Sequence, residues 1–239
     1  MPKINVYLPD DLADAVRDTG LPVSPICQRA LEQAVRRITT IRQAVLSDLD
    51  PDRLSERLPT FTGRLVIVLT LAARRAQESG ASSVTTGDLL HGMLDENQNL
   101  GLQVLTALDV APGSLTAPAT PEPATTGGGL RFSAPAAVAL ELAVGEAIGL
   151  GHNYVGCEHL LIGLAAEPDG GAGDLLRSRA VDGKAARRAV AAALAGYAHL
   201  RAAASDPAGG APASALMTAV RAEMAPLVER IERLEERLN

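Results

Sequence analysis

The chain has 239 residues, of which 47% are hydrophobic but only 2% aromatic, and it contains no tryptophan. Alanine and leucine must therefore build most of the core, which favours close-packed helices over a β-sandwich. The net charge of −6 excludes a globally basic surface, so any contact with nucleic acid has to be local. Cys27 and Cys157 are lone thiols in different segments, and no apolar run reaches membrane-spanning length. Both features predict a cytoplasmic protein without contact to a membrane.

The first residues alternate polar and apolar side chains from Lys3 to Leu8, which is the period of a half-buried strand. Ile4, Val6 and Leu8 would face a core. Pro9 ends the strand, and Asp10 or Asp11 can cap a helix over about residues 12–18.

After a turn at Gly20 and Pro22, Ser24 and Pro25 are typical of the N-cap and first turn of a second helix. That helix would carry Ile26, Ala30, Leu31 and Ala34 on one face. One strand and two helices within about forty residues cannot bury a core alone, so we expect a dimer.

This order of elements resembles the ribbon-helix-helix DNA-binding family over roughly residues 2–40. The resemblance implies an intertwined dimer whose paired strands enter the major groove as an antiparallel ribbon. Lys3, Asn5 and Tyr7 would then face the bases, and the helix that opens at Ser24 would offer backbone N–H groups to phosphate. The alternative is a dimerisation module without DNA binding, because residues 1–45 hold six basic and five acidic side chains and so a charge of only +1.

Helical spacing continues through Ile41, Val45 and Leu49 until Asp50-Pro51-Asp52 interrupts it. We interpret this break as the connection between two domains.

An internal repeat follows, because residues 61–105 match residues 132–176 at a constant offset of 71. The identical pairs are mostly apolar and lie at helical spacing: Phe61/Phe132, Leu69/Leu140, Leu71/Leu142, Ala72/Ala143, Ala76/Ala147, Gly80/Gly151, Val84/Val155, Leu89/Leu160, Leu90/Leu161, Gly92/Gly163 and Leu105/Leu176. This pattern predicts a duplicated helical unit whose apolar faces need each other. Residues 111–129 are rich in Pro, Thr and Gly and predict a mobile linker, and residues 185–200 predict an alanine-rich closing helix.

In the second copy, residues 149–164 read as helix, polar turn and helix, with Glu158 at the start of the second helix where the helix dipole favours a carboxylate. His152, Cys157 and His159, with Glu158 beside them, could suggest a metal cluster. A zinc site needs four ligands, and the sequence marks no position that would supply the fourth. We favour the interpretation that the His and Tyr side chains pin the turn against its helices.

The turn closely resembles the GHNYxGTEHLLLGL signature of the N-terminal repeat domain of Clp-type AAA+ unfoldases. In that family the domain docks substrates, adaptors, phosphoarginine-marked proteins and cyclic peptide antibiotics. The resemblance implies that the turn carboxylate recognises a guanidinium, and that a Thr and an Arg in an FTxR pattern approach the phosphate.

Carried over to this chain, the set is incomplete within each repeat. The second repeat has Glu158 but Ser133 and Pro135 in the Thr and Arg positions, whereas the first keeps Thr62 and Arg64 but has Gly87 in the Glu position. Losing one charged partner from such a site costs on the order of 1.5–3 kcal/mol, so we expect weak phosphoarginine binding. Phe61 and Phe132 lie near the family's peptide groove, and either anchor a peptide or fill the core. The candidate ligand-binding residues are thus Phe61, Thr62, Arg64, Phe132, Ser133, Glu141 and Glu158.

The ATPase engine of those unfoldases is missing from the sequence, which contains no G-x-x-x-x-G-K-[ST] loop. No Ser/His/Asp arrangement stands out either, so we expect a protein that is not an enzyme and uses no cofactor. Near the C-terminus, apolar residues step by 3 and 4 from Met217 to Leu238, which predicts a coiled-coil-like helix.

We therefore predict a mainly α fold in which a tandem helical Clp repeat domain lies between a ribbon-helix-helix unit and a coiled-coil-like helix. The expected boundaries are 1–45 for the N-terminal unit, 46–57 for a connector, 58–110 for repeat 1, 111–129 for a linker, 130–200 for repeat 2, 201–213 for a linker and 214–239 for the last helix. The predicted function is a dimeric transcriptional regulator that binds operator DNA and senses a peptide, antibiotic or damaged-protein ligand. The alternative is a free-standing Clp repeat that acts as a decoy or adaptor and has a Clp unfoldase or protease as partner.

Overall fold

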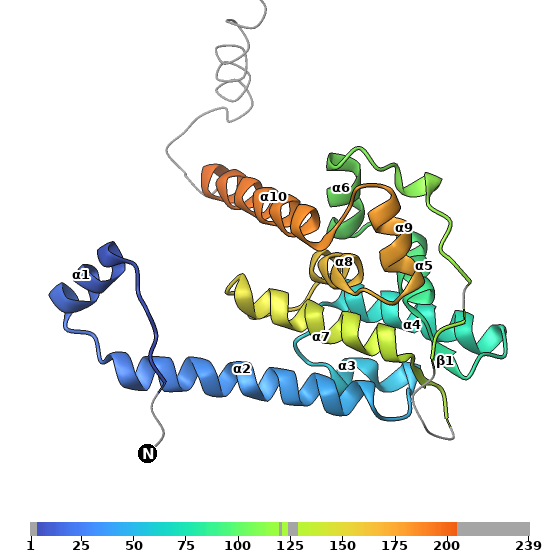
Figure 1. Ribbon diagram of the computed structural model, residues 1–239, viewed down its shortest axis with the longest axis horizontal. Coiled ribbons are helices and arrows are strands. Elements are labelled where there is room, and N and C mark those ends of the chain that lie inside the picture. Colours follow the sequence, from blue (N-terminus) through green and yellow to red (C-terminus); the bar gives the residue numbers. More distant parts are fainter. Residues whose placement is uncertain (1–3, 120, 124–128, 205–239) are drawn as a thin grey trace, which may run out of the picture. The chain divides into compact units, whose positions relative to one another are not determined.

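The computed structural model describes residues 4–119, 121–123 and 129–204, and the described part is mainly helical (Figure 1). The chain divides into two units, Met1–Val190 and Ala191–Asn239. The first unit holds the N-terminal helices and both repeats. Of the second unit, the structure describes only the continuation of helix α10.

Two helices form the N-terminal part, α1 (Asp10–Thr19) and α2 (Val23–Val45). Both predicted helices are confirmed, and Gly20 ends α1 in the left-handed conformation with φ of 62°. The predicted caps are wrong, because Pro9 and Pro22 occupy the N-cap positions and neither helix has a side-chain cap. Ser24 instead lies exposed in the first turn of α2.

The predicted strand at the N-terminus is absent from this single chain, in which residues 4–9 adopt no regular structure. Ile4 and Val6, expected in a core, are 80% and 65% exposed, and Tyr7 is 95% exposed. A strand is held by hydrogen bonds to a neighbour, and the expected neighbour is the same segment of a second copy. Lys3 lies outside the described residues.

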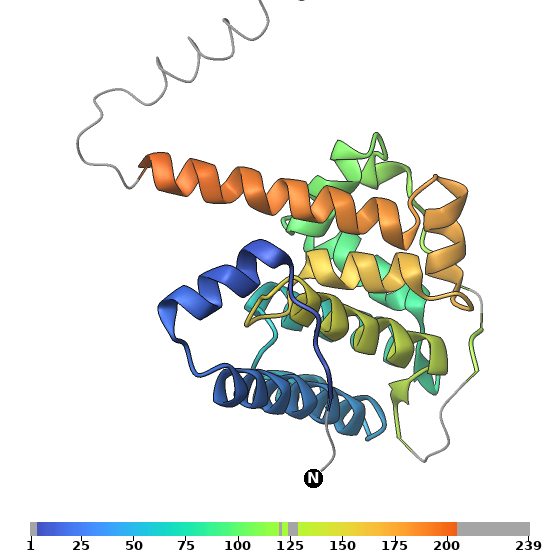
Figure 2. The same ribbon diagram turned by 60° about the vertical axis from the view of Figure 1, so that its left-hand side comes forward.

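The second half of α2 packs on the repeats, mainly against helix α7 (Ala134–Gly149), and both views show the two helices side by side (Figure 1 and Figure 2). Ile41 and Val45 are each only 1% exposed. On the rim of this contact, Arg42 Nε donates to Glu141 Oε2 at 3.0 Å. The helix that begins in the N-terminal unit therefore ends inside the core of the repeat domain.

The segment expected to be a connector is itself folded. It contains a 3-10 turn, η1 (Pro51–Arg53), and the short helix α3 (Leu54–Arg57), with Asp50 accepting a hydrogen bond from the Asp52 N–H at 3.1 Å. Leu54 and Leu58 are 2% and 3% exposed, so this segment contributes to the core.

The duplication is confirmed helix by helix. The first copy consists of α4 (Gly63–Glu78), α5 (Thr86–Glu96) and α6 (Leu100–Ala107), and the second of α7, α8 (Cys157–Ala166) and α9 (Gly171–Ser178). Each helix of the second copy begins 71 residues after its counterpart, since 63 + 71 is 134, 86 + 71 is 157 and 100 + 71 is 171.

The two copies exchange their extended segments. Strand β1 (Ser83–Val84) of the first copy pairs in parallel with β2 (Arg131–Phe132) at the start of the second. In the mirror arrangement, Phe61 at the start of the first copy bridges to Val155 of the second. As a result, the N-terminal arm of each repeat lies against the polar turn of the other repeat.

Close helix contact explains one of the identical glycine pairs. A Cβ atom on Gly92 would lie 2.4 Å from the Val68 oxygen, and one on Gly163 would lie 2.2 Å from the Ala139 oxygen. These glycines let α5 and α8 rest directly on the backbones of α4 and α7. Most of the other identical pairs are buried as predicted, but Leu142 is 36% exposed and Leu71 is half-buried, so that pair lies at the surface.

The described part of the predicted linker packs against the repeats. It includes the 3-10 turn η2 (Pro112–Ser114), and Leu115 and Ala117 are 6% and 9% exposed. The predicted closing helix is confirmed as α10 (Gly183–Ala204), where Asp182 Oδ1 accepts from the Ala185 N–H at 2.7 Å. The predicted coiled-coil-like helix at 214–239 lies outside the described residues. Within the residues described, no helix is both long and apolar enough to cross a membrane.

Candidate functional site

The polar turn between α7 and α8 is held by its own aromatic rings. The Gly156 N–H donates to His159 Nδ1 at 3.0 Å, so the proton of this buried ring is on Nε2, which donates to His152 Nδ1 at 2.8 Å. Tyr154 stacks on His152 with ring centroids 5.2 Å apart. Burial, and then the charge of His152, lower the pKa of His159 to about 4, so the ring is neutral. The prediction that these side chains pin the turn is confirmed.

Glu158 is folded back into the same turn. Its side chain is only 7% exposed, and a Cβ atom on Gly156 would lie 2.4 Å from its Oε2. Burial raises the pKa of Glu158, while a backbone N–H, the charge of His152 and a hydrogen bond from Tyr154 act in the opposite direction. A ligand cation that reaches this carboxylate must therefore enter the turn, since little of the carboxylate faces solvent.

The cross-pairing of the repeats brings Thr62 and Arg64 to the start of α8. The Thr62 N–H donates to the Val155 oxygen at 2.9 Å, three residues before Glu158. Arg64 lies close enough to Cys157 for its charge to affect the pKa of that thiol. In the sequence, Thr62 and Arg64 belong to the first repeat and Glu158 belongs to the second, so each repeat has an incomplete set. In the fold, these residues lie at the same edge of the domain, near the start of α8.

Arg64 is oriented by the far end of its own repeat. Its guanidinium forms an ion pair with Glu96, whose side chain is 5% exposed while that of Arg64 is 52% exposed. Burial alone would raise the pKa of Glu96, but hydrogen bonds from Asn99, Arg64 and the Gln98 N–H outweigh it and lower the pKa. The half-exposed Arg64 is thus a fixed cation beside the N-terminus of α8, which suits an anionic group.

Cys157 is the first residue of α8 and is 2% exposed. Burial, followed by the charges of Glu158 and Glu96, raises the pKa of this thiol to about 12. The thiol therefore stays protonated and is not a nucleophile. In the described ranges, no group of three or more His, Cys, Asp or Glu side chains is arranged to hold a metal ion.

The corresponding edge in the other half of the domain, at the start of α5, is occupied by a residue of the linker between the repeats. Glu122 of the linker accepts a hydrogen bond from the Thr86 N–H at 2.9 Å, and the hydroxyl groups of Thr86 and Ser133 also donate to it. A Cβ atom on Gly87 would lie 2.0 Å from the Pro118 oxygen. Gly87 is therefore required by the linker, and Ser133, a predicted ligand residue, is engaged with Glu122.

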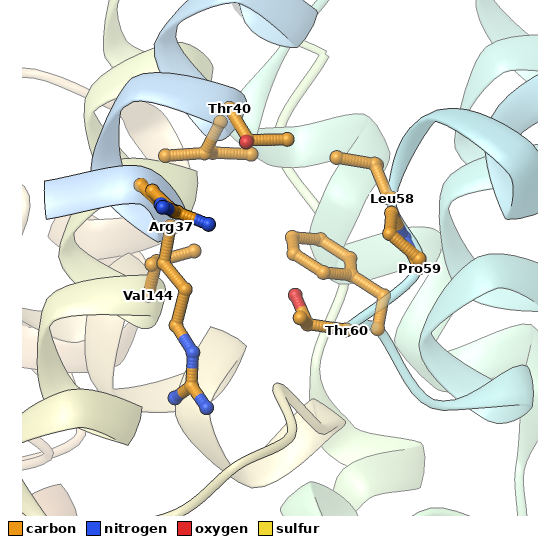
Figure 3. Close-up of a pocket in the computed structure, with 9 residues that line it drawn as sticks. Arg37, Thr40, Leu58, Pro59, Thr60 and Val144 are labelled. Carbon is orange, nitrogen blue, oxygen red and sulfur yellow. The ribbon is translucent and has the colours of Figure 1, made fainter. Parts of the chain in front are cut away.

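An apolar pocket of about 190 Å³ opens between helices α2 and α7 and the segment of residues 58–61 (Figure 3). Arg37 and Val144 lie on one side of it, and Leu58 and Pro59 lie on the other. The complete lining is Arg36, Arg37, Thr40, Ile41, Leu58, Pro59, Thr60, Phe61 and Val144. Four of these nine residues come from α2. Sequence reasoning missed them, although the apolar spacing that continues to Ile41 indicates that this end of α2 has a buried face.

The two phenylalanines of the repeats have different environments. Phe61 lines the pocket and is 8% exposed, whereas Phe132 is 1% exposed and belongs to the core. Of the two alternatives, core filling describes Phe132, whereas Phe61 stays a candidate anchor for a peptide. Glu141 forms an ion pair with Arg42 that links α7 to α2, and its role in ligand binding stays a prediction.

Comparison with known proteins identifies the duplicated unit. The Clp repeat (R) N-terminal domain family matches residues 60–178 and 131–225. A ClpA homologue of Porphyra purpurea, an ATP-binding subunit of the ATP-dependent Clp protease, is 35% identical over 129 residues, which cover 51% of this chain and 15% of that protein. The protein Rv2667 of Mycobacterium tuberculosis is 36% identical over 112 residues, which cover 46% of this chain and 44% of that one.

Among solved structures, the N-terminal domain of the chaperone ClpD from Arabidopsis thaliana is similar, with a TM-score of 0.41 and 21% identity over 57% of this chain and 96% of that one. The chain thus spans less than half the length of the two curated relatives above. The family match extends over both repeats and beyond, from residue 60 to residue 225. The chain belongs to the family of proteins that carry the Clp repeat N-terminal domain.

Proposed function

We propose that the chain is a dimeric DNA-binding regulator whose Clp-like repeat domain receives a peptide-like ligand. The observation that carries the proposal is the exposure of the N-terminal unit. No residue from 4 to 36 is buried in the single chain. The large apolar side chains that are exposed there are Ile4, Val6, Leu8, Leu12, Leu21, Val23, Ile26, Leu31 and Val35.

Apolar side chains in such number, on two helices and the extended segment before them, favour an intermolecular contact. At about 25 cal/mol per Å² of apolar surface buried, their burial is a strong driving force for association. The order of extended segment, short helix and longer helix is that of the ribbon-helix-helix family. A second copy would complete its two-stranded ribbon, with Asn5 and Tyr7 beside Lys3 on the DNA-facing side.

The pocket at Phe61 supports the ligand-receiving part of the proposal. Its floor is apolar, and Arg36 and Arg37 of α2 are part of its lining. A ligand with an apolar body and an acidic group, such as a peptide segment, matches this chemistry. Because α2 carries part of the lining and also belongs to the N-terminal unit, an occupant would contact the element that positions the DNA-binding surface.

The DNA-binding part is tested with the full chain, by capturing genomic fragments and measuring their affinity in gel shifts. Replacement of Lys3, Asn5 and Tyr7 together by Ala is expected to abolish sequence preference, since each base contact contributes roughly 1–3 kcal/mol. Affinity should also fall steeply as salt is raised. Arg53→Ala, at an exposed position in η1, is the control and should bind like the unaltered protein. If the full chain is a dimer but captures no genomic fragment, the N-terminal unit is a dimerisation module without DNA binding.

A second candidate function is that of an adaptor or decoy for a Clp protease system. The observation that favours it is the single edge formed by Thr62, Arg64 and the start of α8. Calorimetry with phosphoarginine, using the unaltered chain and Arg64→Ala, tests this candidate. Binding that Arg64→Ala removes, together with capture of a Clp unfoldase but no DNA, would favour the adaptor over the regulator.

A further inference from the structure

We infer that the repeat domain contains a receptor site for an acidic side chain, and that the chain fills this site with its own Glu122. The site lies between the starts of α5 and α9. Four groups donate to the Glu122 carboxylate: the N–H of Thr86 at 2.9 Å, the N–H of Gly171 at 3.3 Å, and the hydroxyls of Thr86 and Ser133. Thr86 and Ser133 are both 0% exposed.

The chemistry of the site is that of a carboxylate receptor. Thr86 is the first residue of α5 and Gly171 is the first residue of α9, so two helix N-termini direct backbone N–H groups at the same anion. The Thr86 hydroxyl also accepts from the Ala172 N–H at 3.2 Å, which orients it. Hydrogen bonds to a charged acceptor are stronger than neutral ones, so an ionised carboxylate is favoured over an amide of the same shape.

The pseudo-symmetry of the two halves indicates why the carboxylate comes from the linker. The counterpart of Gly87 in the second repeat is Glu158, since 87 + 71 is 158, and there the helix supplies its own buried carboxylate. At Gly87 the space of a side chain is taken by the Pro118 oxygen, 2.0 Å from the position of a Cβ atom. The absence of a side chain at Gly87 therefore leaves room for the linker backbone. The linker in turn places Glu122 at the start of α5, a helix start that has no carboxylate at the position of Glu158.

Backbone contacts seat the same stretch of linker. The Ala134 N–H donates to the Pro123 oxygen at 2.9 Å, and Leu115 and Ala117 are buried. The linker thus behaves as a ligand bound in cis, so a free acidic peptide reaches this site only by displacing Glu122. One consequence is that the two halves of the domain are not equivalent, because among the described linker residues none hydrogen-bonds to Thr62 or Arg64.

The test is chemical rescue in the full chain, read by amide hydrogen exchange at Thr86 and Gly171. Glu122→Ala removes the carboxylate and should lower protection of both amides about tenfold or more. Glu122→Gln keeps the shape without the charge and should give an intermediate loss. Ala119→Ser changes an exposed linker residue and is the control, with no change expected.

Sodium acetate supplies the missing group and should restore protection in Glu122→Ala, whereas acetamide, its neutral isostere, should not. The inference is overturned if Glu122→Ala leaves the protection of Thr86 and Gly171 unchanged. It is equally overturned if acetamide restores protection as well as acetate does, because the site would then recognise shape and not an acidic group.

Discussion

At the scale of single residues, the glycines that recur in both repeats show how closely the helices pack. Gly163 of α8 faces the backbone of α7, and a Cβ atom there would overlap the Ala139 oxygen at 2.2 Å. Backbone cannot move aside as a side chain can. We therefore expect Gly163→Ala to destabilise the domain by roughly 1–3 kcal/mol, the usual cost of overpacking. Urea unfolding measures this change.

Gly145 provides the control for that substitution. It lies within α7 and is exposed, and nothing would meet a Cβ atom there within 4 Å. Gly145→Ala should stabilise the protein by about 0.4–1 kcal/mol, because alanine restricts the unfolded chain and suits a helix. If both alanine variants were equally stable, close helix contact would not explain the glycine at 163.

His159 should titrate far below an ordinary histidine. Its ring is 0% exposed and hydrogen-bonded at both nitrogens in the neutral form, and its pKa is about 4. An NMR titration of the imidazole signals should show this ring unprotonated at pH 5. A midpoint near the ordinary value of about 6.5 would contradict the buried, neutral ring.

The same shift has a consequence for stability. Because the pKa of His159 is lower in the folded than in the unfolded state, the unfolded chain binds more protons between about pH 6.5 and pH 4. The contribution of His159 to the free energy of unfolding is therefore fully present above about pH 6.5. It decreases as the pH falls, by about 2 kcal/mol between pH 7 and pH 5. Glu158, whose pKa is raised, acts with the opposite sign.

Comparison with His159→Gln isolates the histidine, because the desolvation of Glu158 is common to both proteins. The advantage of the unaltered chain in urea unfolding should be smaller at pH 5 than at pH 7. An advantage that stays constant over this range would indicate that His159 does not titrate differently on folding.

At the scale of elements, α2 has two halves with different partners. Ile41 is 1% exposed and packs in the repeat domain, while Val35, nearly two turns earlier, is 63% exposed. Ile41→Ala should cost about 2–5 kcal/mol of folding stability. Val35→Ala should leave the thermal unfolding of the repeat domain unchanged but weaken self-association, measured by sedimentation over a range of concentrations. Equal effects of both changes on unfolding would mean that α2 packs along its whole length.

Features that depend on local periodicity could be predicted from the sequence, and features that depend on partners could not. The helices of both repeats follow from apolar spacing that recurs after 71 residues, and the aromatic pinning of the turn follows from His152, Tyr154 and His159. The N-terminal strand was expected from alternation alone, yet a strand needs a neighbour, which the single chain does not provide. Glu122 was overlooked because its role depends on the fold of Thr86 and Ser133 around it.

The exchange of arms between the repeats could not be predicted for a related reason. Two similar sequences offer the same pairing surface, so sequence does not say whether Thr62 belongs with Gly87 of its own repeat or with Glu158 of the other. In the structure, Phe61 bridges to Val155, so Thr62 lies with Glu158 of the other repeat. The positions matched between the repeats stay the same. What changes is which of these residues meet, because the candidate ligand edge combines Thr62 and Arg64 of the first repeat with Glu158 of the second.

At the scale of the whole molecule, the boundary between self-association and ligand binding falls inside α2. A fragment of residues 58–200 would hold both predicted repeats but would lack Ile41, Val45 and Leu49, which are 1%, 1% and 7% exposed. The absence of Ile41 and Val45 would uncover the side of α7 against which α2 packs. A boundary at residue 37 retains these contacts and removes the exposed apolar residues of the N-terminal unit.

We therefore expect a fragment of residues 37–204 to be a folded monomer, while the full chain is a dimer. Light scattering measures both masses, and a third chain, residues 37–239, separates any contribution of the predicted C-terminal helix from that of residues 1–36. Residues 58–200 should unfold at a lower urea concentration than residues 37–204, because each buried side chain lost removes about 2–5 kcal/mol or leaves apolar surface in water. A stable dimer of residues 37–204 would place the association in the repeats. In that case the exposed face of α1 and α2 would no longer support a ribbon-helix-helix dimer.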